Sequence, residues 1–426
     1  MNLREAEDYL LGLELFGMRF GLDRMHKLMT VLGMPQRSFA SIHVVGTNGK
    51  SSTARFIAAI LERHGLRTGS YTSPHLRSFL ERIEVGERGV PGADFAAAVS
   101  RAARAAEMVD RTQAADDEVT QFEALTAAAY HELARREVEV AVIEAGLGGR
   151  YDATNVIPSK VQVLTSVGLD HTRWLGPTLA DIADEKLAVV RDRSTLVLGP
   201  DLDPAAVGVA ERVAAERHAR IVHAAAVPGV ELRAAGDFQR RNFAVAATAA
   251  EAFLGRELAA EALREAAAQT RIPGRLDVVG RDPLVIHDGA HNPAGAEALA
   301  ASLPEVSEGR RPLVAVVSVL EDKDAAAMLG ALLPACDRVV FTRCSNPRAL
   351  SPATLDSLAR KLGGPAPGAR PAAGARHAAE TVPDPVAALA RARELAGRGG
   401  AVVATGSIYL IADLVRRNAD ARASTL

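Results

Sequence analysis

The stretch that decides the fold is HVVGTNGKSS, residues 43–52, in which a β-branched run leads into a glycine-flanked lysine. This pattern predicts a buried strand ending at Val45, a tight turn, and a helix beginning beside Lys50. Such a turn directs backbone N–H groups and the positive end of a helix dipole at an anion. Lys50 would then contact the outer phosphates of a nucleoside triphosphate, and Ser51 or Ser52 a magnesium ion. The alternative is a connecting turn that carries a surface lysine.

Length, charge and cysteine content narrow the class of protein. At 426 residues the chain is long enough for two domains. A formal net charge of −2 argues against a general nucleic-acid binder. No apolar run approaches the roughly 18 residues of a membrane span, and the first residues, MNLREAEDYL, lack the apolar core of a secretory signal. Cys336 and Cys344 are the only cysteines, which fits a reducing compartment. We expect a cytoplasmic protein that contacts neither membrane nor nucleic acid.

Short β-branched runs alternate with alanine-rich helical stretches along the whole chain. The predicted strands lie in SIHVVG, VEVAVIEAG, KVQVLTSVG, STLVLG, PLVIHDGA, PLVAVVSVL, DRVVFTR and GAVVATG. Near-continuous apolar strands separated by helices indicate parallel sheets covered on both faces, so the fold class is α/β. The stretch QTRIPGRLDVVGRDP, 269–283, interrupts this pattern and predicts two domains, 1–272 and 273–426. The Pro- and Gly-rich stretch 363–379 predicts a surface loop.

Acidic and imidazole side chains follow two of the predicted strands. Glu144 stands at the end of one strand, and Asp170 and His171 come just after another. Ligands of doubly wound sheets bind outside the carboxyl ends of the strands, so Glu144 and His171 are expected near the phosphate loop. With a hydroxyl, phosphate and water they suit magnesium or manganese. The alternatives are a helix-capping or salt-bridging Glu144 and a His171 that only forms a hydrogen bond.

Lys186 occupies an unusual position in the helical stretch GPTLADIADEKLAVVR. Ile182, Lys186 and Val189 share one face of the predicted helix, so an ammonium lies on an apolar stripe. This is costly unless the amine is paired, reaches water or is chemically changed, for example by carbamylation with CO2. From the residues alone, the favoured interpretation is an ammonium that reaches water or pairs with Asp181 or Glu185.

Taken together, the motifs resemble the Mur ligase superfamily, specifically its folate branch of folylpolyglutamate synthases and dihydrofolate synthases. The matching segments, in family order, are HVVGTNGKSST, YTSPHLRSFLERI, EAGLGGRYDATN, SVGLDHTRWLG, EKLAVV, IPGRLDVV, HDGAHNP and EDKD. The resemblance implies an N-terminal P-loop Mur-ligase-type ATPase domain and a smaller C-terminal Rossmann-like α/β domain. One departure is Ser51, where the folate branch usually has glycine after the loop lysine, which leaves open whether Ser51 or Ser52 contacts magnesium.

The resemblance also implies roles for individual residues. The residues implied to contact ATP are Asn48, Gly49, Lys50, Ser51, Asn242, Arg275 and Asp288. Two Mg2+ ions are implied, one of them bound by Ser73, Glu144 and His171. A carbamate is implied on Lys186, which reverses the interpretation from the residues alone.

The implied substrate contacts lie in both domains. Thr120, Phe122 and Asp152 are implied to bind the pterin substrate, although Phe122 can equally be a core aromatic. His291, implied to be catalytic, and Ser407 are candidates for holding the incoming glutamate. Lys323 is a further candidate there, with a plain surface lysine as the alternative.

The implied activity is ATP-driven amide synthesis. A carboxylate of dihydropteroate or of a reduced folate would be phosphorylated, and the amine of L-glutamate would attack the acyl phosphate. The segment 17–29 resembles the N-terminal segment of dual-activity enzymes, although Arg19 replaces an expected acid. We therefore expect a monomeric enzyme with both activities, with tail extension alone as the alternative. A P-loop kinase would not explain HDGAHNP, and a peptidoglycan-precursor ligase would not explain TSPHL.

Overall fold

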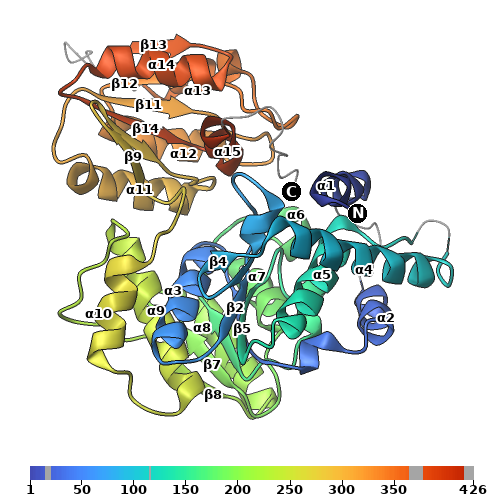
Figure 1. Cartoon of the computed structure of the whole chain (residues 1–426). Helices are drawn as coiled ribbons and strands as arrows, with labels where there is room; N and C mark the ends of the chain where they lie inside the picture. The colour runs from blue at the N-terminus through green and yellow to red at the C-terminus, as the bar shows by residue number, and fades with distance from the viewer. Residues whose placement is uncertain (15–20, 115–116, 364–377, 417–426) are drawn as a thin grey trace. The chain divides into compact units, whose positions relative to one another are not determined.

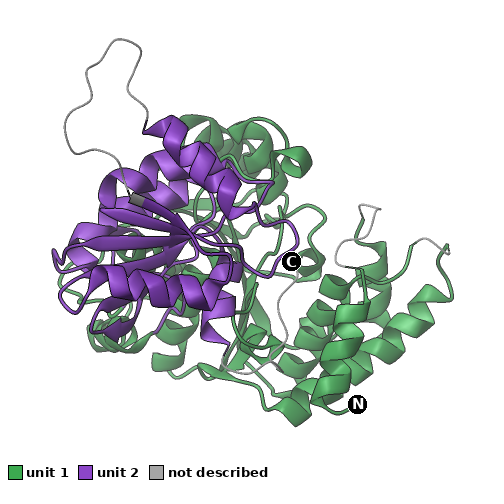
Figure 2. Cartoon of the chain, turned by 90° about the horizontal axis from the view of Figure 1, so that it is seen from above, with its two compact units in different colours: residues 1–233, 239–270, 424–426 green, residues 234–238, 271–423 purple. Residues whose placement is uncertain are grey.

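The computed structural model describes residues 1–14, 21–114, 117–363 and 378–416, and Figure 1 shows their helices and strands. The chain divides into two compact units (Figure 2). The first unit contains residues 1–233 and 239–270, and the second contains residues 234–238 and most of the chain from Arg271 onward. No helix in the described ranges is both long enough and apolar enough to cross a membrane.

The first unit is built on one sheet with the order β4-β3-β2-β5-β1-β6-β7-β8 among the described residues. Its strands are β1 (Ala40–Val45), β2 (Thr68–Tyr71), β3 (Ile83–Val85), β4 (Arg88–Gly89), β5 (Val140–Glu144), β6 (Val161–Leu164), β7 (Thr195–Leu198) and β8 (Arg220–His223). The strands from β2 to β8 in this order are parallel, and β3 and β4 extend one edge antiparallel. Parallel pairing places the carboxyl ends of β5, β1 and β6 side by side.

Helices cover the first sheet. They are α1 (Leu3–Gly12), α2 (Asp23–Val31), α3 (Lys50–Arg63), α4 (Gly92–Asp110), α5 (Gln121–Arg135), α6 (Thr172–Leu175), α7 (Leu179–Leu187), α8 (Pro204–Glu216), α9 (Asp237–Leu254) and α10 (Ala260–Gln269). Short 3-10 turns are η1 (Pro35–Arg37), η2 (Phe79–Arg82) and η3 (Ala153–Val156). Ala141 and Ile143 of β5 join a core formed with α1, α2, α4 and α5. Val45 and Leu164 join a separate core with α7 and α8.

The second unit has its own sheet, with the order β13-β12-β11-β14-β10-β9. Its strands are β9 (Asp277–Arg281), β10 (Leu284–His287), β11 (Leu313–Val317), β12 (Arg338–Phe341), β13 (Ala378–Thr381) and β14 (Ala401–Thr405). Only β9 is antiparallel among these described strands. Its helices are α11 (Pro293–Val306), α12 (Ala325–Leu332), α13 (Pro352–Leu362), α14 (Pro385–Ala396) and α15 (Ile408–Val415), with the 3-10 turn η4 (Leu333–Ala335). Ile286, Val317 and Phe341 anchor its core.

The predicted α/β architecture is confirmed, and all eight predicted strands are present as β1, β5, β6, β7, β10, β11, β12 and β14. Two predictions need correction. The stretch 269–283 contains the strand β9, and the predicted loop 363–379 overlaps the start of β13 at Ala378. The sequence pattern also gave no signal for β2, β3, β4 or β8. These four strands have only two to four residues, and β4 and β8 lie at the edges of the sheet, where a buried apolar run is not required.

Candidate active site

The turn after β1, which the sequence predicts to be a phosphate loop, is closely packed. Gly49 has a φ of 85°, and a Cβ atom there would collide with the side-chain oxygen of Asn242. A Cβ atom at Gly46 would collide with the hydroxyl of Thr165. The loop is also bonded to the segment after β6, because the Thr165 hydroxyl donates to the Asn48 carbonyl at 2.7 Å. The predicted strand, glycine turn and helix are therefore all confirmed, and Asn242 lies against the loop.

Two lysines converge on one backbone carbonyl of this loop. Lys50 Nζ donates to the Gly46 carbonyl at 3.1 Å, and Lys186 Nζ donates to the same oxygen at 3.0 Å. Lys186 is 4 % exposed. Burial, followed by the charge of Lys50, lowers the pKa of Lys186 to about 7. A large share of this amine is therefore neutral near neutral pH, which is unusual for a lysine.

The expectation that Lys186 reaches water or pairs with a neighbouring acid is wrong. Asp181 accepts hydrogen bonds from Thr178 in the capping box that begins α7. Glu185 pairs with Arg150 at 2.8 Å. Both acids are therefore engaged elsewhere, and the Lys186 side chain runs inward to the phosphate loop.

Glu144 gathers polar groups from two other segments. Its Oε1 atom accepts a hydrogen bond from the Ser51 hydroxyl at 2.8 Å, and its Oε2 atom accepts one from the backbone N–H of Ser73 at 3.0 Å. Glu144 is 1 % exposed and Ser52 is 2 % exposed, whereas Ser51 is partly exposed. The Ser51 and Glu144 oxygens form a pair of hard ligands of the kind that Mg2+ accepts alongside phosphate and water.

His171 lies in the segment that follows β6. It precedes α6 with a φ of 51°, and its backbone N–H donates to Asp170 at 2.9 Å. Its ring lies 3.8 Å from the same carboxylate and is partly exposed. Within the described ranges, no three His, Cys, Asp or Glu side chains are arranged to hold a metal ion. The structure thus brings Glu144 together with Ser51 and Ser73, and it places His171 beside Asp170.

Phe122 and Asp152 both lie against Gly146 in the turn after β5. Phe122 is 7 % exposed and stacks on Tyr71 with ring centroids 6.2 Å apart. A Cβ atom at Gly146 would lie 2.7 Å from the Phe122 ring and 3.2 Å from an Asp152 carboxylate oxygen. Thr120 caps α5 and forms a capping box with Glu123. Phe122 is therefore mostly a core aromatic, with one edge against this glycine turn.

In the second unit, Asp288 follows β10 and is held by its own loop. It is 3 % exposed, and its carboxylate accepts from the backbone N–H groups of Leu276 at 2.9 Å and Ala290 at 2.8 Å. Burial raises the pKa of Asp288, and the charge of Arg275 opposes this shift. A Cβ atom at Gly289 would collide with the Arg275 guanidinium, so Arg275 packs directly against this loop. The structure thus brings the predicted pair together.

The other candidates of the second unit also lie beyond strand ends. His291 Nδ1 lies 2.9 Å from the Gly289 carbonyl oxygen, and the Ser407 hydroxyl caps α15 directly after β14. Because β10 and β14 are parallel neighbours, these two loops meet at one edge of the sheet. Lys323 is not a plain surface lysine, since its side chain is only 6 % exposed and lies 3.8 Å from Asp322.

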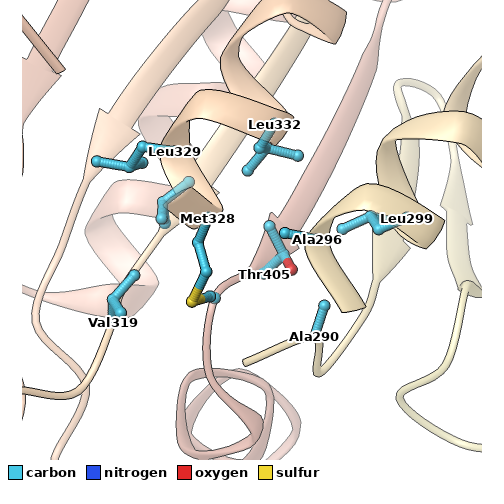
Figure 3. A pocket seen from close by; sticks show the side chains of 10 residues that line it. Ala290, Ala296, Leu299, Val319, Met328, Leu329, Leu332 and Thr405 are labelled. Carbon is cyan, nitrogen blue, oxygen red and sulfur yellow. The ribbon is translucent and has the colours of Figure 1, made fainter. Parts of the chain in front are cut away.

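A small cavity behind these loops is apolar. Ala290, Leu299, Met328 and Leu332 contribute to its wall, and Thr405 points into it (Figure 3). The Thr405 hydroxyl is buried and has no hydrogen-bond partner in the described part of the chain. One hydroxyl in an apolar cavity does not suit a zwitterionic amino acid, which needs several charged or hydrogen-bonding groups.

Several residues that hold the site were missed by the sequence reasoning. Ser166 accepts a hydrogen bond from the backbone N–H of Asn48 at 2.9 Å, beside the bond from Thr165. His43 and Tyr130 both bond to Thr154 in the turn that carries Asp152. The only available signal was a polar residue at a strand end or inside an apolar strand, such as His43 in SIHVVG.

Comparison with known proteins decides the family. Residues 44–222 match the Mur ligase middle domain, and residues 274–408 match the Mur ligase glutamate ligase domain. The chain is 37 % identical over 388 residues to the dihydrofolate synthase/folylpolyglutamate synthase of Mycobacterium tuberculosis, covering 81 % of this chain and 78 % of that protein. It is 33 % identical to the protein of the same name from Bacillus subtilis, covering 97 % and 98 % of the two chains. The chain belongs to the folate branch of the Mur ligases.

Solved structures of this branch of the Mur ligases have the same fold. A Mycobacterium tuberculosis folylpolyglutamate synthase complexed with ADP has a TM-score of 0.87 and 33 % identity, with 97 % of each chain covered. E. coli FolC in complex with DHPP and ADP has a TM-score of 0.82 and 26 % identity, again with 97 % of each chain covered. The Mur ligase middle domain includes Lys50, Glu144 and Lys186, and the glutamate ligase domain includes Asp288 and His291.

Proposed function

We propose that the chain is an ATP-dependent ligase that joins L-glutamate to dihydropteroate and to the glutamate tail of reduced folates. The observation that carries this proposal is the convergence of Lys50 and Lys186 on the Gly46 carbonyl, close to the Ser51–Glu144 pair, in a Mur ligase of the folate branch. Relatives named for both activities in M. tuberculosis, B. subtilis and E. coli support the dual assignment.

The phosphate loop supplies the groups that ATP requires. Asn48, Gly49, Lys50 and Ser51 contact its phosphates, and Asn242 lies at the loop beside Gly49. Mg2+ would be held by the oxygens of Ser51 and Glu144, with a second ion near Ser73, Glu144 and His171. These ions would neutralise charge on the transferred phosphoryl group. Of the two serines, Ser51 is the magnesium ligand, because its hydroxyl points to Glu144 and Ser52 is buried.

Lys186 suits carbamylation. CO2 adds only to a neutral amine, and the pKa of about 7 leaves much of the Lys186 amine neutral at neutral pH. The nitrogen of a carbamate keeps one hydrogen, so the bond to the Gly46 carbonyl can persist. The modification would place an anion on the buried Lys186 side chain beside Lys50, which would pair with Lys50 or face magnesium.

The reaction follows from these groups. Lys50 neutralises charge while the γ-phosphate passes to the acceptor carboxylate, which gives an acyl phosphate. The amine of L-glutamate then attacks, and the intermediate collapses to amide and phosphate. Phe122, Thr120 and Asp152 bind the acceptor. In the second unit Arg275 and Asp288 contact ATP, and His291, Ser407 and Lys323 hold the glutamate. The proposed enzyme acts as a monomer in the cytoplasm, and analytical ultracentrifugation checks its oligomeric state.

The test uses purified protein, ATP, magnesium and labelled glutamate, with dihydropteroate or a reduced monoglutamyl folate in separate reactions. We expect a glutamylated product and stoichiometric ADP from both acceptors. Product from the reduced folate alone would leave tail extension as the function. ADP release that does not depend on glutamate would favour a kinase. The segment 17–29, which motivated the dual assignment, lies partly outside the described residues, since residues 15–20 are not among them.

A further inference from the structure

A chain of three buried side chains links β1 to the turn that carries Asp152. His43, in the middle of β1, is fully buried, and its Nε2 atom lies 2.8 Å from the Thr154 hydroxyl. The same hydroxyl makes a short hydrogen bond to Asp152 Oδ1. Thr154 and Asp152 are 0 % and 6 % exposed, so solvent does not compete with these bonds.

The direction of these bonds follows from counting protons. A carboxylate can only accept, so the single proton of the Thr154 hydroxyl points to Asp152. The hydroxyl oxygen must then accept from His43, which requires the imidazole proton on Nε2. Burial, followed by the charge of Arg191, lowers the pKa of His43 to about 3, so the ring is neutral. Its Nδ1 atom has no hydrogen-bond partner among the described residues. His43 therefore donates to Thr154, and Thr154 donates to Asp152.

Asp152 connects this chain of hydrogen bonds to the glycine turn after Glu144. Its Oδ2 atom accepts from the backbone N–H of Leu147 at 2.8 Å, and its Oδ1 atom accepts from the backbone N–H of Thr154 at 3.0 Å. Burial raises the pKa of Asp152, and these bonds, together with one from the Gly146 N–H, oppose the shift. The carboxylate thus links the glycine turn after β5 to the turn η3 that Asp152 caps.

The 146–148 glycine turn determines the position of the Phe122 ring. A Cβ atom at Gly146 would lie 2.7 Å from that ring, so the glycine packs directly against it and a shift of the turn toward the ring would cause a collision. Tyr130 of α5 donates to the Thr154 carbonyl at 3.0 Å, so α5 also holds the turn η3 next to Asp152. His43 lies in β1, and Gly46 is the first residue after this strand, only three positions further along the chain. The turn is therefore tied to the strand that carries the phosphate loop.

We propose that His43 and Thr154 are positioning residues for the acceptor substrate, which act through Asp152 to fix the 146–148 turn and the Phe122 ring relative to the phosphate loop. This inference rests on the proposed ligase function, because only an acceptor that receives a phosphoryl group must lie in line with it. A misplacement of about 1 Å can reduce a rate about 10²-fold.

The first test compares Thr154→Val with Thr154→Ser. Valine keeps the shape but leaves both His43 and Asp152 without the hydroxyl, and serine retains it. For Thr154→Val we expect the KM for dihydropteroate to rise about tenfold and kcat to fall, because a hydrogen bond to a charged group is lost. The KM for ATP should change by less than about twofold. Thr154→Ser should rescue most of the loss.

A second pair keeps or removes the donor on β1. His43→Gln can place an amide N–H near the Nε2 position, whereas His43→Leu cannot donate. We expect His43→Leu to match Thr154→Val, and the double variant His43→Leu/Thr154→Val to be little worse than either single variant, because all three break one chain of bonds. If these variants lower the melting temperature equally but leave the KM for the acceptor unchanged, the side chains have a structural role only, and the inference is overturned.

A third measurement needs no variant. Nitrogen-15 spectra of the histidine rings in the unaltered protein should show His43 as the neutral Nε2–H tautomer, with a resonance that shifts when dihydropteroate is added. The Nδ1–H tautomer would reverse the chain and overturn the inference. Failure of the unaltered protein to glutamylate any acceptor would instead refute the proposed function, whereas an active protein with a normal acceptor KM in Thr154→Val would refute the inference alone.

Discussion

The loops after β1 and β10 occupy equivalent places, at the carboxyl end of a parallel strand, but they stabilise opposite charges. In the first unit, a backbone carbonyl accepts hydrogen bonds from the Nζ atoms of Lys50 and Lys186. In the second unit, backbone N–H groups donate to the carboxylate of Asp288, and Arg275 lies against the loop.

This difference indicates which of the two loops needs a bound ligand to balance its charges. Two cations that share one neutral carbonyl repel each other, and this repulsion contributes to the low pKa of Lys186. An anionic ligand would relieve that repulsion, so the first loop is suited to bind phosphate. Asp288 already has two N–H donors and a neighbouring guanidinium. We therefore expect variants of the first loop to lose mainly activity, and variants of the second loop to lose stability as well.

The largest effect is expected for Lys50→Ala. Removal of the ammonium that faces the transferred phosphoryl group should lower kcat by about 10³-fold, with little change in the melting temperature. Glutamate-dependent ADP release and a thermal melt measure the two quantities. Lys361→Ala, at an exposed lysine of α13, is the matched control. Near-normal ADP release by folded Lys50→Ala would contradict the assignment of the phosphate loop.

Lys186→Ala should lose about 10²-fold in kcat, since it removes both the buried amine and the carbamate proposed on it. A short carboxylic acid added to the assay should restore part of the activity of this variant and none of that of Lys50→Ala. The kcat of the unaltered protein should fall in buffer depleted of CO2 and should recover when bicarbonate is added. A crystal structure with ATP and magnesium that shows an unmodified Lys186 ammonium would refute the carbamate.

Asp288→Asn tests the self-contained loop of the second unit. An amide has one oxygen, so one of the two N–H donors, from Leu276 or Ala290, would face an NH2 group. The free energy of unfolding should fall by about 2 kcal/mol, in addition to any loss of activity. Urea unfolding measures it, with Asp322→Asn, at a partly exposed acid, as the control. An unchanged unfolding midpoint would remove the contrast between the two loops.

The smallest expected effect is on the pH dependence of the protein's stability. It comes from His287, which directly precedes Asp288. Burial lowers the pKa of His287 to about 4, whereas an unfolded histidine titrates near about 6.5. Between these values the unfolded state binds more protons, so the stability is complete above about pH 6.5 and is lost as the pH falls toward 4. From about pH 7.5 to about pH 5.5 the contribution is roughly 1.4 kcal/mol.

The measurement is urea unfolding across this pH range for the unaltered protein and His287→Gln. We expect a shallower pH dependence in the variant, because glutamine does not titrate. His218→Gln, at an exposed histidine, should keep the full slope. The buried His43 also contributes to the pH dependence of stability, but it is present in all three proteins, so its contribution is the same in each. Identical slopes in all three would contradict a buried, neutral His287.

Local patterns in the sequence were sufficient to predict the phosphate loop and its helix, because the strand, the glycines and Lys50 are neighbours in the chain. They also placed Glu144 at a strand end, whereas Asp288 was named only through the resemblance to the folate branch. They did not predict that Lys186 is buried against Gly46, since that contact spans 140 residues. The bonds between His43, Thr154 and Asp152 were missed for the same reason, because His43 and Thr154 are 111 residues apart. Contacts between distant segments leave no periodic signal in either segment.

The hydrogen bonds that join Asn48 to Thr165 and Ser166 have a consequence for the synthesis of the protein. They join residues 117 and 118 positions apart, so the phosphate loop acquires its walls only after β6 has been translated and has paired with β1. A nascent chain that ends before β6 would contain every residue of the GTNGKSS motif and still lack the groups that hold Asn48 in place. We therefore expect a nascent chain to bind nucleotide only after the segment up to Ser166 has emerged and β6 has paired with β1.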